Sequence, residues 1–124
     1  MDNKSIHWSL TIGVSAGYDL EHQKRPEEDK MVQIYAEAAA ETEEKTGIYI
    51  SAVIWPTRSI YKQEWGCPKE GEYTFTFTGS CDPAFAETET YKEALLELTQ
   101  RLKEKLLQST VLLEIVPAEV FYFR

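Results

Sequence analysis

Hydrophobic and polar residues alternate along the first part of the chain. The apolar positions are Ile6, Trp8, Leu10, Ile12 and Val14, and the positions between them are small or polar. An alternation with a period of two places one set of side chains on each face of a β-strand. The pattern therefore predicts a strand over residues 6–14 with one buried face.

Two later segments change to the spacing of an amphipathic helix. The first helix is expected from Pro26 to about Thr46, because proline suits the first turn and Gly47 suits the C-cap. The second is expected to begin at the capping box Thr90-x-x-Glu93. The stripes predicted to be buried are Met31, Ile34, Tyr35, Ala38 and Thr42 in the first helix, and Tyr91, Leu95, Leu98, Leu102 and Leu106 in the second.

Residues 48–81 return to a period of two and predict a long hairpin. Its turn should lie in the segment 66–71, which contains glycine and proline, and Pro56 should interrupt its first strand. A last strand is expected over residues 111–116. Pro117 should break this strand, and residues 120–123 are a candidate extension of it.

The predicted order of elements is strand, helix, strand, strand, helix, strand, which is the ferredoxin-like α+β arrangement. Right-handed crossovers then give the sheet order 4-1-3-2, antiparallel or mixed, with both helices on one face. Pro56 and Pro117 agree with this order, because they lie in the two strands predicted at the edges, where proline is tolerated. We therefore predict a single α+β domain over residues 1–124.

The sheet face opposite the helices is predicted to be polar but uncharged. Its residues should be His7, Ser9, Thr11, Tyr49, Ser51, Trp55, Thr74, Thr76 and Thr78. A face that only contacts water would be expected to carry more Lys and Glu, so Thr11, Thr74 and Thr76 are candidates for binding a ligand or a second subunit. Threonine is equally a common residue on the solvent face of a strand, and the sequence leaves both interpretations open.

Charge and composition exclude several classes of function. The 124 residues carry a net charge of −8, from 21 acids against 13 bases, which disfavours contact with nucleic acid. No apolar run approaches the roughly 20 residues that span a bilayer, and the first residues do not resemble a secretion signal. Cys67 and Cys81 should lie about 30 Å apart, at opposite ends of one strand, too far for a disulfide. Free thiols suit a reducing compartment, so a cytoplasmic protein without a membrane partner is expected.

The motifs that carry chemistry are sparse. Residues 13–17 match the G-x-S-x-G pattern of serine hydrolases, but the helix that should follow Ser15 is expected only at Pro26. The two His and two Cys residues lack the spacing of a metal site, and no phosphate-binding motif is present. We therefore predict neither a metal nor a cofactor.

Two hypotheses of function follow. The leading one is a non-catalytic binding domain, expected to be a homodimer. It would use the threonine face and an aromatic hairpin and could bind a basic protein partner. The hairpin residues proposed for binding are Trp55, Arg58, Tyr61 and Trp65, since Trp, Tyr and Arg are enriched at binding hot spots. The alternative is a small cofactor-free enzyme, an isomerase or lyase, with His7 as acid or base in a pocket and Tyr49 or Tyr18 assisting.

Overall fold

The computed structural model describes residues 3–14 and 24–124. Its elements follow the predicted order of strand, helix, strand, strand, helix, strand. They are β1 (Lys4–Gly13), α1 (Glu28–Thr46), β2 (Val53–Ser59), the short 3-10 helix η1 (Gln63–Trp65), β3 (Glu72–Ser80), α2 (Thr88–Lys105) and β4 (Leu112–Glu119).

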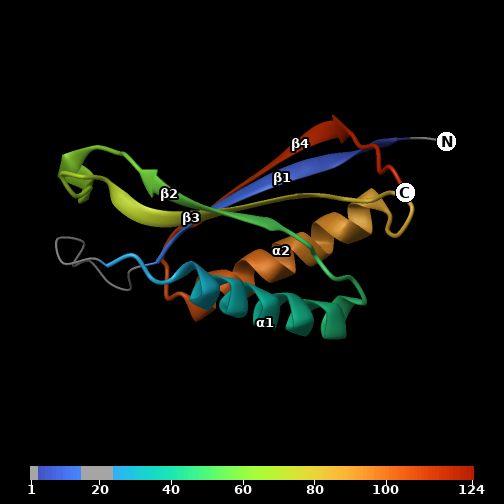
Figure 1. Cartoon of the computed structure of the whole chain (residues 1–124), viewed down its shortest axis with the longest axis horizontal. Helices are drawn as coiled ribbons and strands as arrows, with labels where there is room; N and C mark the ends of the chain where they lie inside the picture. The colour runs from blue at the N-terminus through green and yellow to red at the C-terminus, as the bar shows by residue number, and fades with distance from the viewer. Residues whose placement is uncertain (1–2, 15–23) are drawn as a thin grey trace.

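The four strands form one antiparallel sheet in the order β2-β3-β1-β4. Figure 1 shows α1 and α2 side by side beneath one face of this sheet, and the β2–β3 hairpin extends beyond the helices. The ferredoxin-like α+β prediction is confirmed, including the central position of β1 and β3. The face opposite the helices is left open.

The two strand prolines lie on the edge strands, as predicted. Pro56 is opposite Phe75 in the β2–β3 pair, and Pro117 is opposite Ile6 in the β1–β4 pair. The expectation that they interrupt their strands is wrong, because β2 and β4 continue through them. An edge strand has one side without a partner strand, so a residue that lacks an N–H group can be accommodated there.

The segment before β2 does not form the strand that its alternation predicted. β2 begins only at Val53. The Tyr35 hydroxyl donates to the Ile50 carbonyl at 2.8 Å, and the Ile48 N–H donates to Thr46 Oγ1 at 3.2 Å. These side chains of α1 satisfy backbone groups that a strand would use, and they hold residues 48–50 against the helix.

Two other predicted boundaries are wrong. α2 begins at Thr88 with Glu87 as its N-cap, so the proposed capping box lies inside the helix. Residues 120–124 do not extend β4, and Phe121 and Phe123 are exposed rather than buried in their own sheet.

The core lies between the sheet and the two helices, as the stripes predicted. Its largest fully buried side chains include Trp8, Leu10 and Ile12 from β1 and Phe75 and Phe77 from β3. The Tyr35 ring of α1 stacks on Phe77 with 4.7 Å between centroids. Trp8 is the largest buried side chain, and its indole N–H donates to the Tyr91 hydroxyl at 2.8 Å. This packing leaves the threonine residues of β1 and β3 on the open face.

Candidate functional site

Hydroxyl groups on the open face bond to one another across three strands. Thr11 of β1 and Thr76 of β3 lie opposite each other with 3.2 Å between their Oγ1 atoms. Thr57 of β2 is 2.7 Å from Thr74 Oγ1 and 3.1 Å from Thr76 Oγ1. We call Thr11, Thr57, Thr74 and Thr76 the threonine ladder. It brings together the three threonines proposed for binding, whose role in binding remains a prediction.

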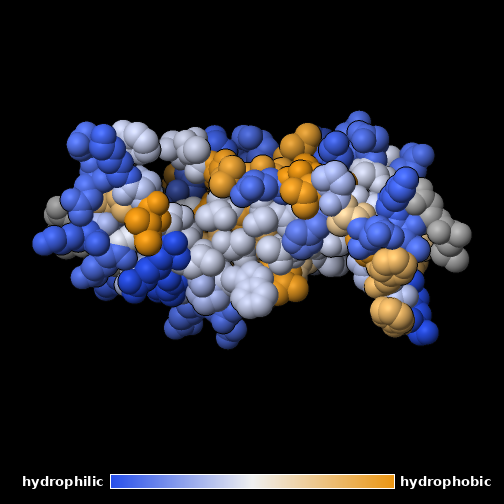
Figure 2. Space-filling view, turned by 90° about the horizontal axis from the view of Figure 1, so that it is seen from above, coloured by the Kyte–Doolittle hydropathy of each residue, from blue (hydrophilic) through white to orange (hydrophobic). Residues whose placement is uncertain are grey.

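Apolar side chains flank the threonine ladder. Figure 2 shows this face as a pale central surface with hydrophobic patches beside it. The exposed apolar residues of the edge strands are Val53 and Trp55 on β2 and Leu112 and Val116 on β4, each about half exposed. The Trp55 indole N–H lies 3.4 Å from Thr78 Oγ1. The open face therefore carries little charge over its centre.

A tyrosine and a carboxylate meet where the hairpin leaves the threonine ladder. The Tyr61 hydroxyl donates to Glu72 Oε1 at 2.7 Å, and both side chains are partly buried. Tyr61 follows β2, and Glu72 begins β3. The backbone N–H of Tyr61 lies 3.4 Å from the sulfur of Cys67, which is buried in the connecting loop. The loop thus folds back and holds the two side chains together.

Gly13 makes room for the Glu72 carboxylate. A Cβ atom on Gly13 would lie 2.5 Å from Glu72 Oε2, and it would also contact the end of the Gln108 side chain. Thr74 is the residue opposite Gly13 in the β1–β3 pair. Glu72 is two residues before Thr74, so its carboxylate lies on the open face in phase with the threonines. A larger residue at position 13 could not coexist with this carboxylate position.

The Tyr61 phenol is held in its protonated form. Burial raises its pKa above the ordinary value, and the hydrogen bond to the Glu72 carboxylate and its negative charge raise the pKa further. Near neutral pH, Tyr61 is therefore a hydrogen-bond donor and not a base. It orients one oxygen of Glu72 and leaves the other directed toward Gly13.

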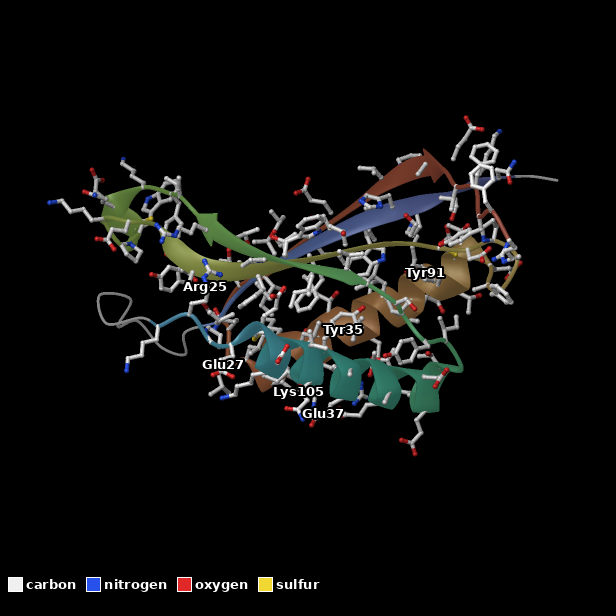
Figure 3. The ribbon with its side chains drawn as sticks, viewed as in Figure 1. Arg25, Glu27, Tyr35, Glu37, Tyr91 and Lys105 are labelled. Atoms are coloured by element: carbon white, nitrogen blue, oxygen red, sulfur yellow. The ribbon has the colours of Figure 1, made fainter. Side chains whose placement is uncertain are left out.

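Two arginines hold the hairpin strands from the helix side. Arg25 donates to the carbonyl of Thr74 at 3.1 Å and to that of Thr57 at 3.0 Å, and its guanidinium lies 4.6 Å from the Tyr73 ring centroid. In Figure 3, its side chain lies beneath β3. Arg58 donates to the Glu70 carbonyl at 3.2 Å and lies 5.2 Å from the same ring. Arg25 thereby fixes the two strand residues that carry half of the threonine ladder.

A pocket of about 430 Å³ lies at the other end of the sheet. It is formed by the end of α1, the start of α2 and the C-terminal segment; its lining includes Tyr49, Ser51, Ser80, Phe85, Tyr91 and Tyr122. We call it the tail pocket. His7 is exposed, and its Nδ1 lies 3.0 Å from the hydroxyl of Ser80. Tyr49 and Ser80 thus line the tail pocket, whereas His7, which contacts Ser80, does not.

The remaining predicted site residues are scattered. Trp65 lies in η1 and is 75% exposed, with Lys62 6.0 Å from its ring centroid. Tyr18 and Ser15 lie outside the described residues. Sequence reasoning missed Glu72, although a signal was present: it is an acid in phase with Thr74 and Thr76 on the same strand. Its partner Tyr61 was proposed only as a contact residue.

Among residues 3–14 and 24–124, no cluster of three or more His, Cys, Asp or Glu side chains could hold a metal ion. Neither α1 nor α2 combines the length and apolar character of a membrane-spanning helix.

Comparison with known proteins gives two kinds of match. The family model described as SAM lyase matches residues 3–124. A solved phage SAM lyase in complex with S-methyl-5'-thioadenosine is similar, with a TM-score of 0.65, 17% sequence identity, and coverage of 97% of this chain and 85% of that chain. A phage SAM lyase in its apo state has a TM-score of 0.63 at 12% identity, with coverage of 100% and 96%. No curated protein matches.

These matches correct the leading hypothesis of function. The interpretation as a non-catalytic binding domain is wrong, because the matching family is one of enzymes. The alternative, a small enzyme of the lyase kind, agrees better with the findings. At such low identity the two solved structures support the fold alone. The family model covers nearly the whole chain, and the chain therefore belongs to the SAM lyase family.

Proposed function

We propose that this chain cleaves S-adenosylmethionine and releases S-methyl-5'-thioadenosine. The observation that carries the proposal is the match of the SAM lyase family model over residues 3–124. The ligand in one similar solved structure, S-methyl-5'-thioadenosine, is the thioether that remains when the aminobutyryl group leaves the sulfonium. The product named here follows from that chemistry.

The bond that breaks joins the sulfonium to the four-carbon amino acid chain. Its electron pair moves to sulfur, which becomes a neutral thioether. The four-carbon fragment can close on its own carboxylate, which forms a C–O bond and a five-membered lactone. It can instead lose a proton from the adjacent carbon to a base, which forms a double bond. Both routes balance without water, as a lyase requires.

We propose that the positively charged part of the substrate binds at the hairpin end of the open face. Glu72 supplies a carboxylate there, and the Tyr61 hydroxyl orients it at 2.7 Å. The neighbouring threonine ladder is uncharged, so Glu72 is the group that attracts the sulfonium or the ammonium of the substrate. In the lactone route Glu72 orients the substrate, and in the elimination route it also accepts the proton.

The test is a direct assay with S-adenosylmethionine. Mass spectrometry should detect S-methyl-5'-thioadenosine together with a four-carbon product, whose identity as lactone or unsaturated amino acid distinguishes the two routes. Glu72→Gln keeps the shape of the side chain and removes its charge, and the rate should fall on the order of 100-fold. The matched control is Glu70→Gln, at an exposed position in the same hairpin, which should keep the wild-type rate.

An absence of S-methyl-5'-thioadenosine from the wild-type reaction would contradict the proposed activity. Full activity of Glu72→Gln would leave the activity intact and contradict the assignment of the site.

We also propose that the open face mediates self-association, as the sequence suggested. The hydroxyls of the threonine ladder bond to one another, so a second copy could cover them without leaving them unpaired. The half-exposed Val53, Trp55, Leu112 and Val116 supply apolar area around them. Light scattering should find a species larger than the monomer, and Trp55→Glu should shift it toward the monomer. A strict monomer in the wild type would refute this proposal.

A cytoplasmic location also remains a proposal. Cys67 and Cys81 are both free and buried, which suits a reducing compartment. The predicted absence of nucleic-acid and membrane partners stays a prediction.

A further inference from the structure

The tail pocket is large enough for a small ligand and lies away from Glu72. Its volume of about 430 Å³ falls in the range of small-molecule sites, roughly 300–1,000 Å³. Ser80 lines it and ends β3, whereas Glu72 begins β3. Eight residues of strand separate them by roughly 25 Å. One nucleoside-sized molecule cannot contact both places on the same chain.

The walls of the tail pocket are aromatic. Tyr49 and Tyr122 are each nearly half exposed, and Phe85 is 79% exposed. Tyr91 closes the inner side, where Figure 3 shows it reaching from α2 toward the sheet. Aromatic side chains that line one space favour a flat ring, since stacking of a base on an aromatic side chain is worth about 1–3 kcal/mol. The pocket is therefore suited to a heteroaromatic base.

The charge of the pocket differs from that of the hairpin end. Asp82 lines the pocket, but its Oδ2 pairs with the Arg124 guanidinium and its Oδ1 accepts the Ala84 N–H at 3.0 Å. The same guanidinium lies 5.3 Å from the Phe85 ring centroid and 5.0 Å from that of Tyr122. A cation of the chain already neutralises this carboxylate, so the pocket favours an uncharged ligand.

Tyr91 adds a hydrogen-bond donor. Its hydroxyl accepts the Trp8 indole N–H at 2.8 Å, and within the described part of the chain its own proton has no acceptor. Burial raises the pKa of Tyr91 to about 12, so the proton is retained at neutral pH. Tyr91 is only 5% exposed, and an unused donor in so buried a residue suits a ligand that brings an acceptor.

We propose that the tail pocket is a second ligand site, separate from Glu72, and that it binds an uncharged purine nucleoside. The choice of nucleoside rests on the proposed function: the substrate is a cation, whereas S-methyl-5'-thioadenosine is its neutral product. The ring packs against Tyr49 and against the sides of Tyr122 and Phe85 that line the pocket, which Arg124 does not line. Ring nitrogens or ribose oxygens accept from Tyr91, Ser51 and Ser80. Product bound in this way would occupy the chain without blocking Glu72.

The three tryptophans allow a direct test by NMR. Trp8 bonds to Tyr91 at the pocket, Trp65 lies in the hairpin loop, and Trp55 lies on the open face. S-Methyl-5'-thioadenosine is titrated into ¹⁵N-labelled wild type, Glu72→Gln and Tyr122→Ala, and the three indole N–H signals are followed. The Trp8 signal should shift saturably in wild type and in Glu72→Gln with similar Kd. Tyr122→Ala should weaken that Kd about tenfold at an unchanged melting temperature.

The cationic substrate provides a second comparison in the same experiment. In Glu72→Gln, S-adenosylmethionine should shift Trp8 at least tenfold more weakly than the neutral nucleoside does. No saturable Trp8 shift in the wild type, or loss of the shift in Glu72→Gln, would overturn the proposal, because the second result means a single shared site. A saturable Trp8 shift in a wild-type protein that does not cleave S-adenosylmethionine would refute the proposed function but support the tail pocket as a ligand site.

Discussion

The two ends of β3 differ in what they offer a ligand. At the hairpin end, Glu72 supplies a negative charge that Tyr61 orients beside uncharged threonines. At the other end, Ser80 opens onto the tail pocket, where volume and aromatic surface are present and Asp82 is neutralised by Arg124. The carboxylate proposed for the chemistry and the tail pocket thus lie at opposite ends of one strand. The proposed substrate is a cation and its product is neutral, and variants at each end can test whether the two ends have separate roles.

Gly13→Ala is expected to reduce activity as strongly as Glu72→Gln does, at an unchanged fold. The new Cβ would lie 2.5 Å from Glu72 Oε2, so the carboxylate must move. The atoms that move are the ends of flexible side chains, so the melting temperature should stay within about 2 °C. A displacement of this size at a reacting group can cost on the order of 100-fold in rate, and kcat for release of S-methyl-5'-thioadenosine should fall accordingly.

The matched control for Gly13→Ala is a glycine at the other end. Gly47 ends α1 with φ of 80° and would have nothing within 4 Å of an added Cβ. Gly47→Ala should cost about 1 kcal/mol of unfolding free energy through backbone strain and keep the wild-type kcat. If Gly13→Ala retains full activity, or if both variants lose only stability, the hairpin end does not carry the chemistry.

Tyr61→Phe should lower kcat by about tenfold. It removes one hydrogen bond to a charged group, worth about 1.5–3 kcal/mol, and leaves the Glu72 charge in place. Steady-state assays should show a smaller loss than for Glu72→Gln, and the double variant should lose little more than Glu72→Gln alone, because Tyr61 acts through that carboxylate. Strictly additive losses would mean that Tyr61 acts on the substrate independently.

The sheet order and the threonine face could be predicted from the sequence. The sheet order followed from the element order and right-handed crossovers. Pro56 and Pro117 agreed with it, since a proline is confined to an edge by its missing N–H. Thr11, Thr74 and Thr76 were placed on one face because a strand alternates with a period of two. Rules of this kind can be applied to the sequence without knowledge of tertiary contacts.

The two candidate sites depend on contacts that the sequence pattern does not encode. Tyr61 reaches Glu72 only because the intervening loop folds back with Cys67 buried beneath it. The tail pocket joins segments near residues 49, 85 and 122, and α2 begins at Thr88 rather than at the expected capping box. Alternation and capping describe single elements, so neither could bring these segments together.

Alkaline pH should reduce the contribution of Tyr91, at the tail pocket, to the free energy of unfolding. The folded chain raises the pKa of Tyr91 from an ordinary value near 10 to about 12, mainly through burial. Its contribution is fully present below pH 10 and is lost as pH rises from 10 through 12, because the unfolded chain ionises first. Urea unfolding across this range should show a smaller decrease in Tyr91→Phe than in wild type, although the variant is less stable throughout. Equal slopes in both proteins would show that Tyr91 does not titrate as its burial implies.

The smallest effect is expected from His7→Ala, which also tests the role that the sequence suggested for this residue. His7 is exposed and has a hydroxyl, that of Ser80, as its neighbour at 3.0 Å. It pairs with Ser80 across the sheet, eight residues along β3 from Glu72 and therefore roughly 25 Å from it. At that separation it cannot exchange a proton with a substrate held by Glu72 on the same chain. The rate should change less than twofold, and the pH profile between 5.5 and 8 should be unaltered. A large loss at His7 would move the chemistry to the tail end, or would place a second copy's His7 beside Glu72, and either result would end the separation of roles between the two ends of β3.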